Sequence, residues 1–322
     1  MLHTALCDLV GIDVPVVQAG MSIFTSPALA AAVSNAGGLG SLGAWQRPVE
    51  QLRRDVAELS DSTEQPFALN HVVPDLDYIG FELTLEAAPA VVSFALDDAG
   101  ELMKKAHDVG SLVMQQVTTV QQAEVAVDHG ADIIVAQGAE AGGYGGSVAT
   151  LALVPQVVDA VRPVPVLAAG GIADGRGVAA ALVLGAAGVN LGTRFLASEE
   201  SPVGHIWKRA ILTSASETWV QLDFFNDLRP NPGALGYGTR VRALRTAFTD
   251  AWQQRRDEIS ADPTPALTEL ATAATEGKLE ELVVVGGQSA GLIGELLPAA
   301  DIVRMLESEA ESILSNAPTL VV

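Results

Sequence analysis

The stretch DIIVAQGAEAGGYGGSVATLALVPQVVDAVRPVPVLAAGG, residues 132–171, contains the pattern that decides the fold. It opens with a short apolar run, 132–136, and passes through a glycine-rich loop into a helical segment, 149–160. A second apolar run, 164–168, follows. Near-continuous apolar strands that alternate with helices are typical of a parallel sheet covered by helices. The stretch therefore predicts one strand–helix–strand unit of an α/β protein.

The same alternation recurs throughout the first 200 residues. The predicted strands span residues 14–18, 40–42, 66–71, 90–94, 111–117, 132–136, 164–168 and 188–191. Helices are predicted over residues 27–35, 48–59, 76–87, 99–108, 119–129, 149–160 and 174–184. Eight strands, with glycine-rich segments directly after many of them, favour a closed (β/α)₈ TIM barrel whose loops gather on one rim. An open doubly wound sheet is the alternative, but the first turn, residues 19–22, lacks a G-x-G-x-x-G fingerprint.

The pattern changes beyond residue 200. Helices are predicted over residues 207–214, 240–256 and 264–275, with a loop rich in Asn, Pro and Gly over 226–238 and one or two helices within 291–313. These features predict three parts of the chain. Residues 1–200 form the barrel, residues 201–285 form an appended helical region that covers its mouth, and residues 286–322 return to the barrel.

Composition excludes several classes of partner. The chain has 39 acidic and 18 basic residues, for a net charge of −21, so it lacks the basic face that nucleic acid or an anionic membrane surface requires. Its single cysteine, Cys7, excludes an intramolecular disulfide and a cysteine-rich zinc site, and no His and carboxylate residues have metal-site spacing. With no evident signal peptide or membrane span, a cytoplasmic location is expected.

Two glycine-rich segments are the candidate binding loops. Residues 137–146 contain five glycines directly after a predicted strand, which lets the backbone approach a ligand closely; a flexible surface loop is the plain alternative. Backbone amides of Gly170, Gly171, Gly192 and Thr193 could converge on a phosphate, as loops after the seventh and eighth barrel strands often do. An acidic protein can bind an anion in this way.

Two charged residues beside these loops have competing roles. Asp174 is expected to cap the helix that follows it. Arg194 could pair with the phosphate or with an acidic neighbour. Glu140, inside the first glycine loop, is expected to order that loop by accepting hydrogen bonds from backbone amides.

Several motifs in one order carry a family resemblance. Residues 15–21 (PVVQAGM), 34–40 (SNAGGLG), the segments above and 287–293 (GQSAGLI) resemble the nitronate monooxygenase (2-nitropropane dioxygenase-like) family. The related flavin-dependent enoyl-acyl-carrier-protein reductases share the pattern. The resemblance implies a (β/α)₈ barrel that binds FMN. Carried over to this sequence, the FMN contacts fall on Met21, Asn70, Gln137, Gly142, Gly170, Gly171, Asn190, Leu191, Gly192, Thr193, Ser289 and Gly291.

The resemblance also implies a role for each group of these residues. Met21 would pack near the flavin ring, and Asn70 and Gln137 would hydrogen-bond the ring or the ribityl chain. The glycines and residues 190–193 would hold the ribityl chain and the phosphate, and Ser289 and Gly291 would close the site.

The sequence departs from the family at one catalytic position. The family's Gly-Gly-His loop has Tyr144 in place of the histidine. Because an ordinary tyrosine pKa is about 10, Tyr144 is a poor base at pH 7 but a suitable hydrogen-bond donor or acid. A role that only fills the rim is the alternative. His71, directly after Asn70, could replace the missing histidine from the opposite side, although a lone histidine is more often structural.

The function implied by the resemblance is an FMN-dependent oxidoreductase that oxidises alkyl nitronates, or a similar small carbanion-like substrate, with O₂. A nitronate is already deprotonated and needs no base. An NAD(P)H-dependent reductase of an enoyl, activated alkene or quinone substrate is the second hypothesis, since Tyr144 suits a proton donor. An FMN-binding protein that has lost catalysis is the third, and a flavin-free barrel enzyme is remote. Exposed apolar surface on the appended helices could support a homodimer.

Overall fold

The computed structural model describes residues 2–230 and 237–320. Within these residues, eight parallel strands form one sheet in the order β1-β9-β8-β6-β5-β4-β3-β2. The strands are β1 (Val16–Gln18), β2 (Gly40–Gly43), β3 (Phe67–Val72), β4 (Val91–Ala95), β5 (Leu112–Val117), β6 (Ile133–Gln137), β8 (Val166–Ala169) and β9 (Gly188–Leu191). The two end strands meet through a parallel bridge between Val17 and Leu39, so the sheet closes on itself. The predicted barrel is confirmed.

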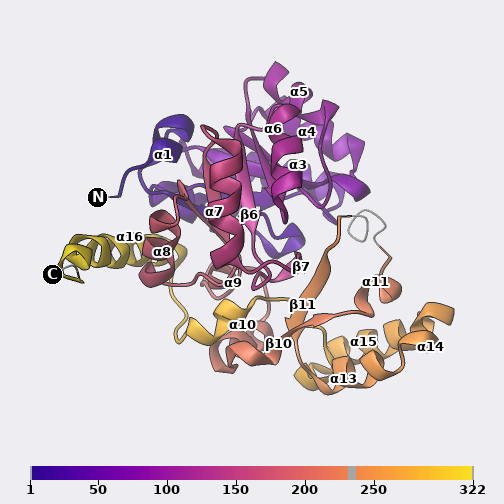
Figure 1. Ribbon diagram of the computed structural model, residues 1–322. Helices are drawn as coiled ribbons and strands as arrows, with labels where there is room; N and C mark the ends of the chain where they lie inside the picture. The colour runs from indigo at the N-terminus through magenta and orange to yellow at the C-terminus, as the bar shows by residue number, and fades with distance from the viewer. Residues whose placement is uncertain (1, 231–236, 321–322) are drawn as a thin grey trace.

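Helices surround the barrel as the alternation predicts (Figure 1). They are α2 (Pro27–Asn35), α3 (Val49–Ser62), α4 (Tyr78–Ala87), α5 (Glu101–Asp108), α6 (Val120–Asp128), α7 (Thr150–Val161) and α8 (Gly175–Val183). Local signals fix their starts: the Ser26 side chain accepts from Leu29 N ahead of Pro27, and the Thr119 side chain accepts from Gln122 N. A further short helix, α1 (Ala5–Val10), packs Leu6 against the apolar barrel interior and closes its amino-terminal end.

The appended region contains a small sheet as well as helices. Its strands are β10 (Trp219–Leu222), β11 (Arg240–Leu244) and β7 (Gly143–Gly145), and all pairings are antiparallel. The helix predicted over 240–256 is therefore wrong in its first part, because residues 240–244 pair with a strand on each side. Helix α13 (Ala247–Gln254) starts only after a capping box made by Thr246 and Thr249.

The remaining helices lie around that sheet and on the barrel wall. They are α9 (Thr193–Leu196), α10 (His205–Thr213), α11 (Phe225–Leu228), α14 (Arg256–Ala261), α15 (Thr264–Glu276) and α16 (Ala299–Asn316). Helix α16 packs against α8 and α2, so this helix lies against the barrel wall (Figure 1). Part of the predicted loop 226–238 lies outside the described residues.

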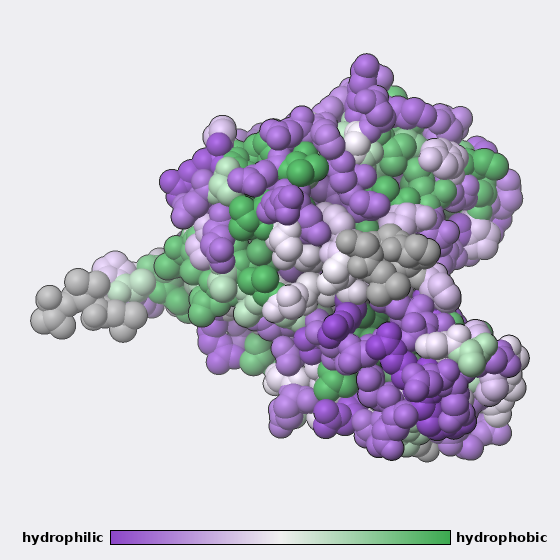
Figure 2. All heavy atoms as spheres, turned by 45° about the vertical axis from the view of Figure 1, so that its right-hand side comes forward, coloured by the Kyte–Doolittle hydropathy of each residue, from purple (hydrophilic) through white to green (hydrophobic). Residues whose placement is uncertain are grey.

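Hydrophilic side chains dominate the visible face of the appended region in Figure 2. None of the described helices combines the length and the hydropathy that crossing a membrane requires.

Strand β3 extends one residue beyond its predicted end, and His71 lies inside the strand. Successive strand residues point to opposite faces, so Asn70 and Val72 face the barrel interior while His71 faces the helices. The His71 Nε2 atom lies 2.9 Å from Thr84 Oγ1, and its ring meets Phe81 edge-on at 5.2 Å. Burial lowers the His71 pKa to about 4, although Asp77 opposes the shift. The expected place on the rim is thus wrong, because His71 is part of the core beneath α4.

The buried imidazole predicts an acid-sensitive stability. A folded-state pKa of about 4 lies below the ordinary value of 6.5, so the unfolded chain binds this proton more tightly. The neutral imidazole therefore gives its full contribution to the free energy of unfolding above pH 6.5. That free energy falls by roughly 3 kcal/mol in total as the pH drops toward 4. We expect the unfolding free energies of the wild type and His71→Gln, measured in urea across this range, to converge as pH falls. Parallel curves for the two proteins would contradict the assignment.

Gly40 sets the distance between β2 and α2. A Cβ atom at Gly40 would overlap the backbone carbonyl of Ala30, which is part of a buried helix and cannot move aside cheaply. We expect Gly40→Ala to lower the free energy of unfolding by about 2–3 kcal/mol, measured by urea denaturation. Gly294→Ala is the matched control, because nothing lies within 4 Å of its added methyl group. Equal stability of the two variants would refute this packing argument.

Candidate active site

Polar side chains line the carboxyl end of the barrel interior. Asn70 donates from Nδ2 to Ser93 Oγ at 2.8 Å, and Gln116 donates from Nε2 to Gln137 Oε1 at 3.1 Å. Asn190 is also buried, and its Oδ1 has no hydrogen-bond partner among the described residues. A buried carbonyl oxygen of this kind is costly unless a bound group donates to it. These five residues, which we call the polar ring, have the chemistry of a site for a polar ligand.

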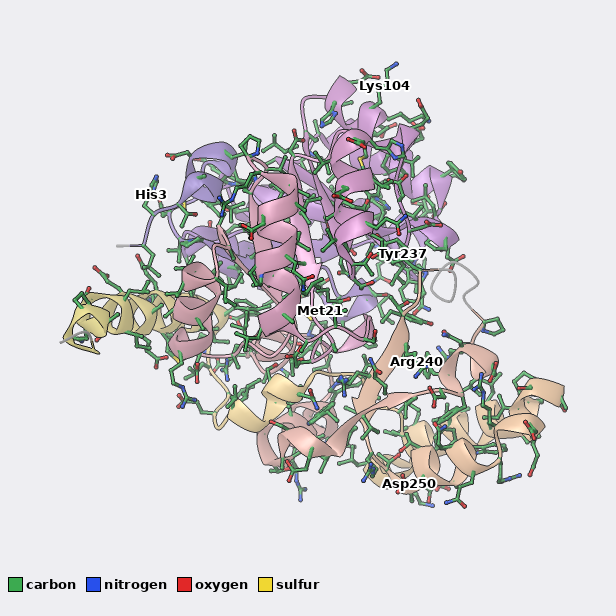
Figure 3. All side chains as sticks on the ribbon, in the orientation of Figure 1. His3, Met21, Lys104, Tyr237, Arg240 and Asp250 are labelled. Atoms are coloured by element: carbon green, nitrogen blue, oxygen red, sulfur yellow. The ribbon has the colours of Figure 1, made fainter. Side chains whose placement is uncertain are left out.

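The loop after β1 carries Met21 to this end of the barrel. Gly20 passes so close to the polar ring that a Cβ atom there would overlap the side chain of Asn70. The Met21 sulfur lies beside Gly192, 3.4 Å from where a Cβ atom would stand. In Figure 3, Met21 lies between the barrel and the appended region. Met21, Asn70 and Gly192, predicted from distant motifs, therefore meet at one end of the barrel.

The glycine loop after β6 is held from two sides. Within the barrel, Glu140 accepts hydrogen bonds from Thr150 N at 2.9 Å and Thr150 Oγ1 at 2.8 Å, which confirms its expected ordering role. From the appended region, buried Arg242 donates to the Ala139 carbonyl at 3.0 and 2.7 Å and to the Trp219 carbonyl at 2.6 Å. Burial lowers the Arg242 pKa, which the charge of Glu140 opposes. Hydrogen bonds from the barrel and from the appended region therefore fix the position of the glycine loop.

Gly142 is the point where the carboxyl-terminal part of the chain reaches this loop. A Cβ atom at Gly142 would stand 2.5 Å from the Gly286 carbonyl carbon, so the two backbones touch. The adjacent Gly287 donates from its amide to Thr193 Oγ1 at 2.9 Å. Buried Ser289 follows two residues later, in a 3₁₀ turn. The segment that begins at Gly286 therefore lies against the glycine loop and Thr193, and closure of the site by Ser289 stays a prediction.

Backbone amides suited to an anion lie after the last two barrel strands. Gly170 and Gly171 have φ angles of 102° and 75°, which glycine adopts without strain. Gly192 precedes α9, and the amides of Thr193 and Arg194 have no acceptor within this short helix, whereas Phe195 N donates to the Gly192 carbonyl at 2.9 Å. These four residues are the ones predicted to converge on a phosphate.

The start of α8 is not available for that purpose. Asp174 accepts from Arg176 N at 3.0 Å and from Gly177 N at 3.2 Å, as expected of a cap. Glu309 of α16 accepts from Gly175 N at 2.9 Å. Arg194 is also engaged elsewhere, because its Nη2 donates to the Glu295 carbonyl at 3.0 Å. An anion at this rim would therefore depend on the α9 end.

Three of the residues predicted to form the site, His71, Leu191 and Gly291, have side chains or contacts that point away from the polar ring. His71 faces α4. Leu191 points into the apolar layer under the helices, so only its backbone borders the site. Gly291 packs against Ser216 of the appended region. The structure does not bring these three together with the polar ring.

Tyr144 lies in an apolar setting above the polar ring. It packs against the cluster of Val72, Ala95 and Leu96 at the ends of β3 and β4, and its ring meets Phe225 at 6.4 Å. Burial raises the pKa of Tyr144 to about 12, although Arg229 opposes the shift. The hydroxyl therefore keeps its proton at neutral pH. It can donate a hydrogen bond to a ligand oxygen but cannot serve as a base.

Sequence reasoning missed four residues of this site. Ser93 and Gln116 could have been found from strand alternation, since both point inward beside Asn70 and Gln137. Arg242 lies in the segment predicted as a helix over 240–256, and that prediction gives no reason to place its side chain against the glycine loop. Tyr237, labelled in Figure 3, donates from its hydroxyl to the Gln116 carbonyl at 3.1 Å, and no motif marked it.

Comparisons with known proteins agree with this architecture. A carboxyl-CoA dehydrogenase of Mycobacterium tuberculosis, named for a 5-hydroxy-7a-methyl-1-oxo-octahydro-indene-4-carboxyl-CoA, is 32% identical, and the match covers 99% of both chains. A nitronate monooxygenase of Paraburkholderia phytofirmans is 32% identical over 95% of this chain and 94% of the relative. The structure of FabK from Thermotoga maritima is 33% identical, with a TM-score of 0.89 and full coverage of both chains.

The sequence model of a family described as nitronate monooxygenase matches residues 3–81 and 75–309. These matches together span most of the barrel, the glycine loop and the appended region. They support an oxidoreductase, and the chain belongs to the nitronate monooxygenase family.

Proposed function

We propose that this protein is an FMN-dependent oxidoreductase that oxidises alkyl nitronates with O₂. The observation that carries the proposal is the buried, unpartnered Asn190 Oδ1 within the polar ring. The isoalloxazine edge and the ribityl chain present donors and acceptors that such amide groups match. FMN fits the residues present better than a group bound through a basic patch, because the amides at Gly171, Gly192 and Thr193 are uncharged.

Each group of residues has a part in this proposal. Met21 would pack on the flavin, and Asn70, Gln137 and Asn190 would orient it. When bound, FMN would accept two electrons from the substrate and pass them to O₂. The Tyr144 hydroxyl would donate a hydrogen bond to a nitro oxygen and hold the anionic substrate against the flavin. Because the substrate arrives deprotonated, the reaction needs no base.

A second candidate is an NAD(P)H-dependent reductase of an activated alkene. Two observations favour it. Tyr144 keeps its proton, which suits a group that protonates a carbon next to a carbonyl. A relative named as a carboxyl-CoA dehydrogenase also matches nearly the whole chain.

Loss of the unpartnered amide tests the cofactor assignment. We expect Asn190→Ala to raise the Kd for FMN about tenfold, because one buried hydrogen bond is lost. The measurement is quenching of flavin fluorescence on titration of the protein from which flavin has been removed. Gln156→Ala is the matched control, since Gln156 Nε2 only donates to its own helix at Ala152. Protein that is colourless and takes up no FMN would overturn the proposal.

Removal of one oxygen atom tests the role of Tyr144. Tyr144→Phe keeps the ring contact with Phe225, so FMN affinity should stay within about twofold. The value of kcat should fall roughly 10- to 100-fold, as a donor to the developing charge is lost. Unchanged kcat would remove Tyr144 from the reaction.

The redox partner is decided by anaerobic stopped-flow absorbance. Rapid flavin bleaching by an alkyl nitronate, followed by recovery with O₂, supports the proposed function. Bleaching by NADH or NADPH, with none by nitronates, supports the second candidate.

A further inference from the structure

We infer that Arg229 binds the negative charge of the substrate beside the Tyr144 hydroxyl, and that it makes the enzyme select substrates that arrive as anions. This inference rests on the proposed function and deepens it by naming a further specificity-determining residue. Arg229 directly follows α11 in the appended region, and it is an exposed residue. Helix α11 lies beside β11, the strand that pairs with β7 and its Tyr144 (Figure 1). An exposed cation is therefore attached to the same small sheet as Tyr144.

Helix α11 carries Arg229 to the side of the mouth where Tyr144 lies. The Arg229 amide donates to the Phe225 carbonyl at 2.8 Å, so Arg229 follows Phe225 by one helical turn, and residues at this spacing share one face of a helix. The Phe225 ring meets the Tyr144 ring edge-on at 6.4 Å. The Arg229 charge also acts on the hydroxyl itself, because it opposes the rise of the Tyr144 pKa that burial causes. The backbone, the ring contact and the charge thus agree on a guanidinium near the Tyr144 hydroxyl.

The guanidinium of Arg229 has no protein partner to displace. Within residues 2–230 and 237–320, no carboxylate pairs with it and no side-chain hydrogen bond engages it. Asp227, the acidic residue on α11, pairs instead with Arg256 at 2.6 Å. The sequence that follows, residues 230–238, contains no acidic residue. The donors of Arg229 are therefore available to a ligand, unlike those that buried Arg242 gives to backbone carbonyls.

An anionic substrate needs a cation at this place because the protein as a whole repels it. The chain has a net charge of −21, so its long-range field opposes the approach of a nitronate. The neutral hydroxyl of Tyr144 donates one hydrogen bond but supplies no charge that offsets this repulsion. A guanidinium supplies that charge together with paired N–H groups, which match the two oxygens of a nitronate. A neutral nitroalkane gains little from the same group, so Arg229 favours the anion.

Removal of the charge tests this inference in the holoenzyme. With ethyl nitronate as substrate and O₂ consumption as the readout, Arg229→Gln should raise KM about fivefold and leave kcat within about twofold, because an exposed ionic contact is lost. Added salt should narrow the difference in kcat/KM between wild type and variant, since salt screens the lost attraction. Arg229→Lys should restore most of the affinity because it keeps the charge. Arg304→Gln is the matched control, since it removes the same charge from an exposed residue of α16.

Nitrate binding supplies a second arm that needs no turnover. Nitrate is a planar anion with oxygens placed like those of a nitronate, and its Kd is measured from the change in flavin absorbance on titration. Arg229→Gln should raise this Kd about fivefold, whereas Arg304→Gln should leave it unchanged. Equal KM and Kd values in wild type and Arg229→Gln, or no nitrate binding to the wild type, would overturn the inference in an enzyme that still oxidises ethyl nitronate. Failure of the wild type to turn over any nitronate would instead refute the proposed function, and this inference with it.

Discussion

The architecture of the mouth depends on the attachment of the glycine loop to the small sheet. Strand β7, inside that loop, pairs with β11, and Arg242 of β11 donates to the loop carbonyl at Ala139. This contact places Tyr144 over the polar ring and brings the appended region against the barrel. The glycines are required for it, because backbone from residues 286–287 touches Gly142 directly. Without this attachment the eight strands could still form the barrel, but the glycine loop at its mouth would lose the contacts that fix its position.

The buried arginines near this attachment bear on how an acidic chain would hold the proposed anionic cofactor. Arg242 and Arg194 are the buried cations nearest the glycine segments, and both donate to backbone carbonyls. These bonds offset part of the cost of burying the two guanidinium groups, although Arg194 Nε has no partner among the described residues. A phosphate at this rim would instead meet the amides of Gly171, Gly192 and Thr193, for which a net charge of −21 is no obstacle.

The sequence predicts the barrel well and the mouth only in part, for physical reasons. All eight barrel strands lie within two residues of their predicted bounds, because buried parallel strands are nearly continuous apolar runs. Residues 143–145 and 240–244 carry no such signal: one is Gly-Tyr-Gly, and the other is rich in residues that favour helices. They become strands only by pairing with each other and with β10. His71 lies inside both the predicted and the observed strand, where neighbouring residues point to opposite faces, so it cannot share the inward face of Asn70.

Polar and apolar side chains occupy two different levels along the barrel axis. The amide side chains of Asn70, Gln137 and Asn190 are buried in the barrel. The apolar residues Val72, Ala95 and Leu96 lie beyond them, where β3 and β4 end at the rim. Tyr144 stands at this boundary, with its ring among apolar side chains and its proton retained. A planar cofactor over the polar ring and a substrate above it would therefore meet at the Tyr144 hydroxyl. Under either candidate function Tyr144 would be the proton donor at this point, and the arrangement is compatible with electron flow in either direction. The choice between oxidation and reduction would then depend on which second substrate reaches the proposed flavin.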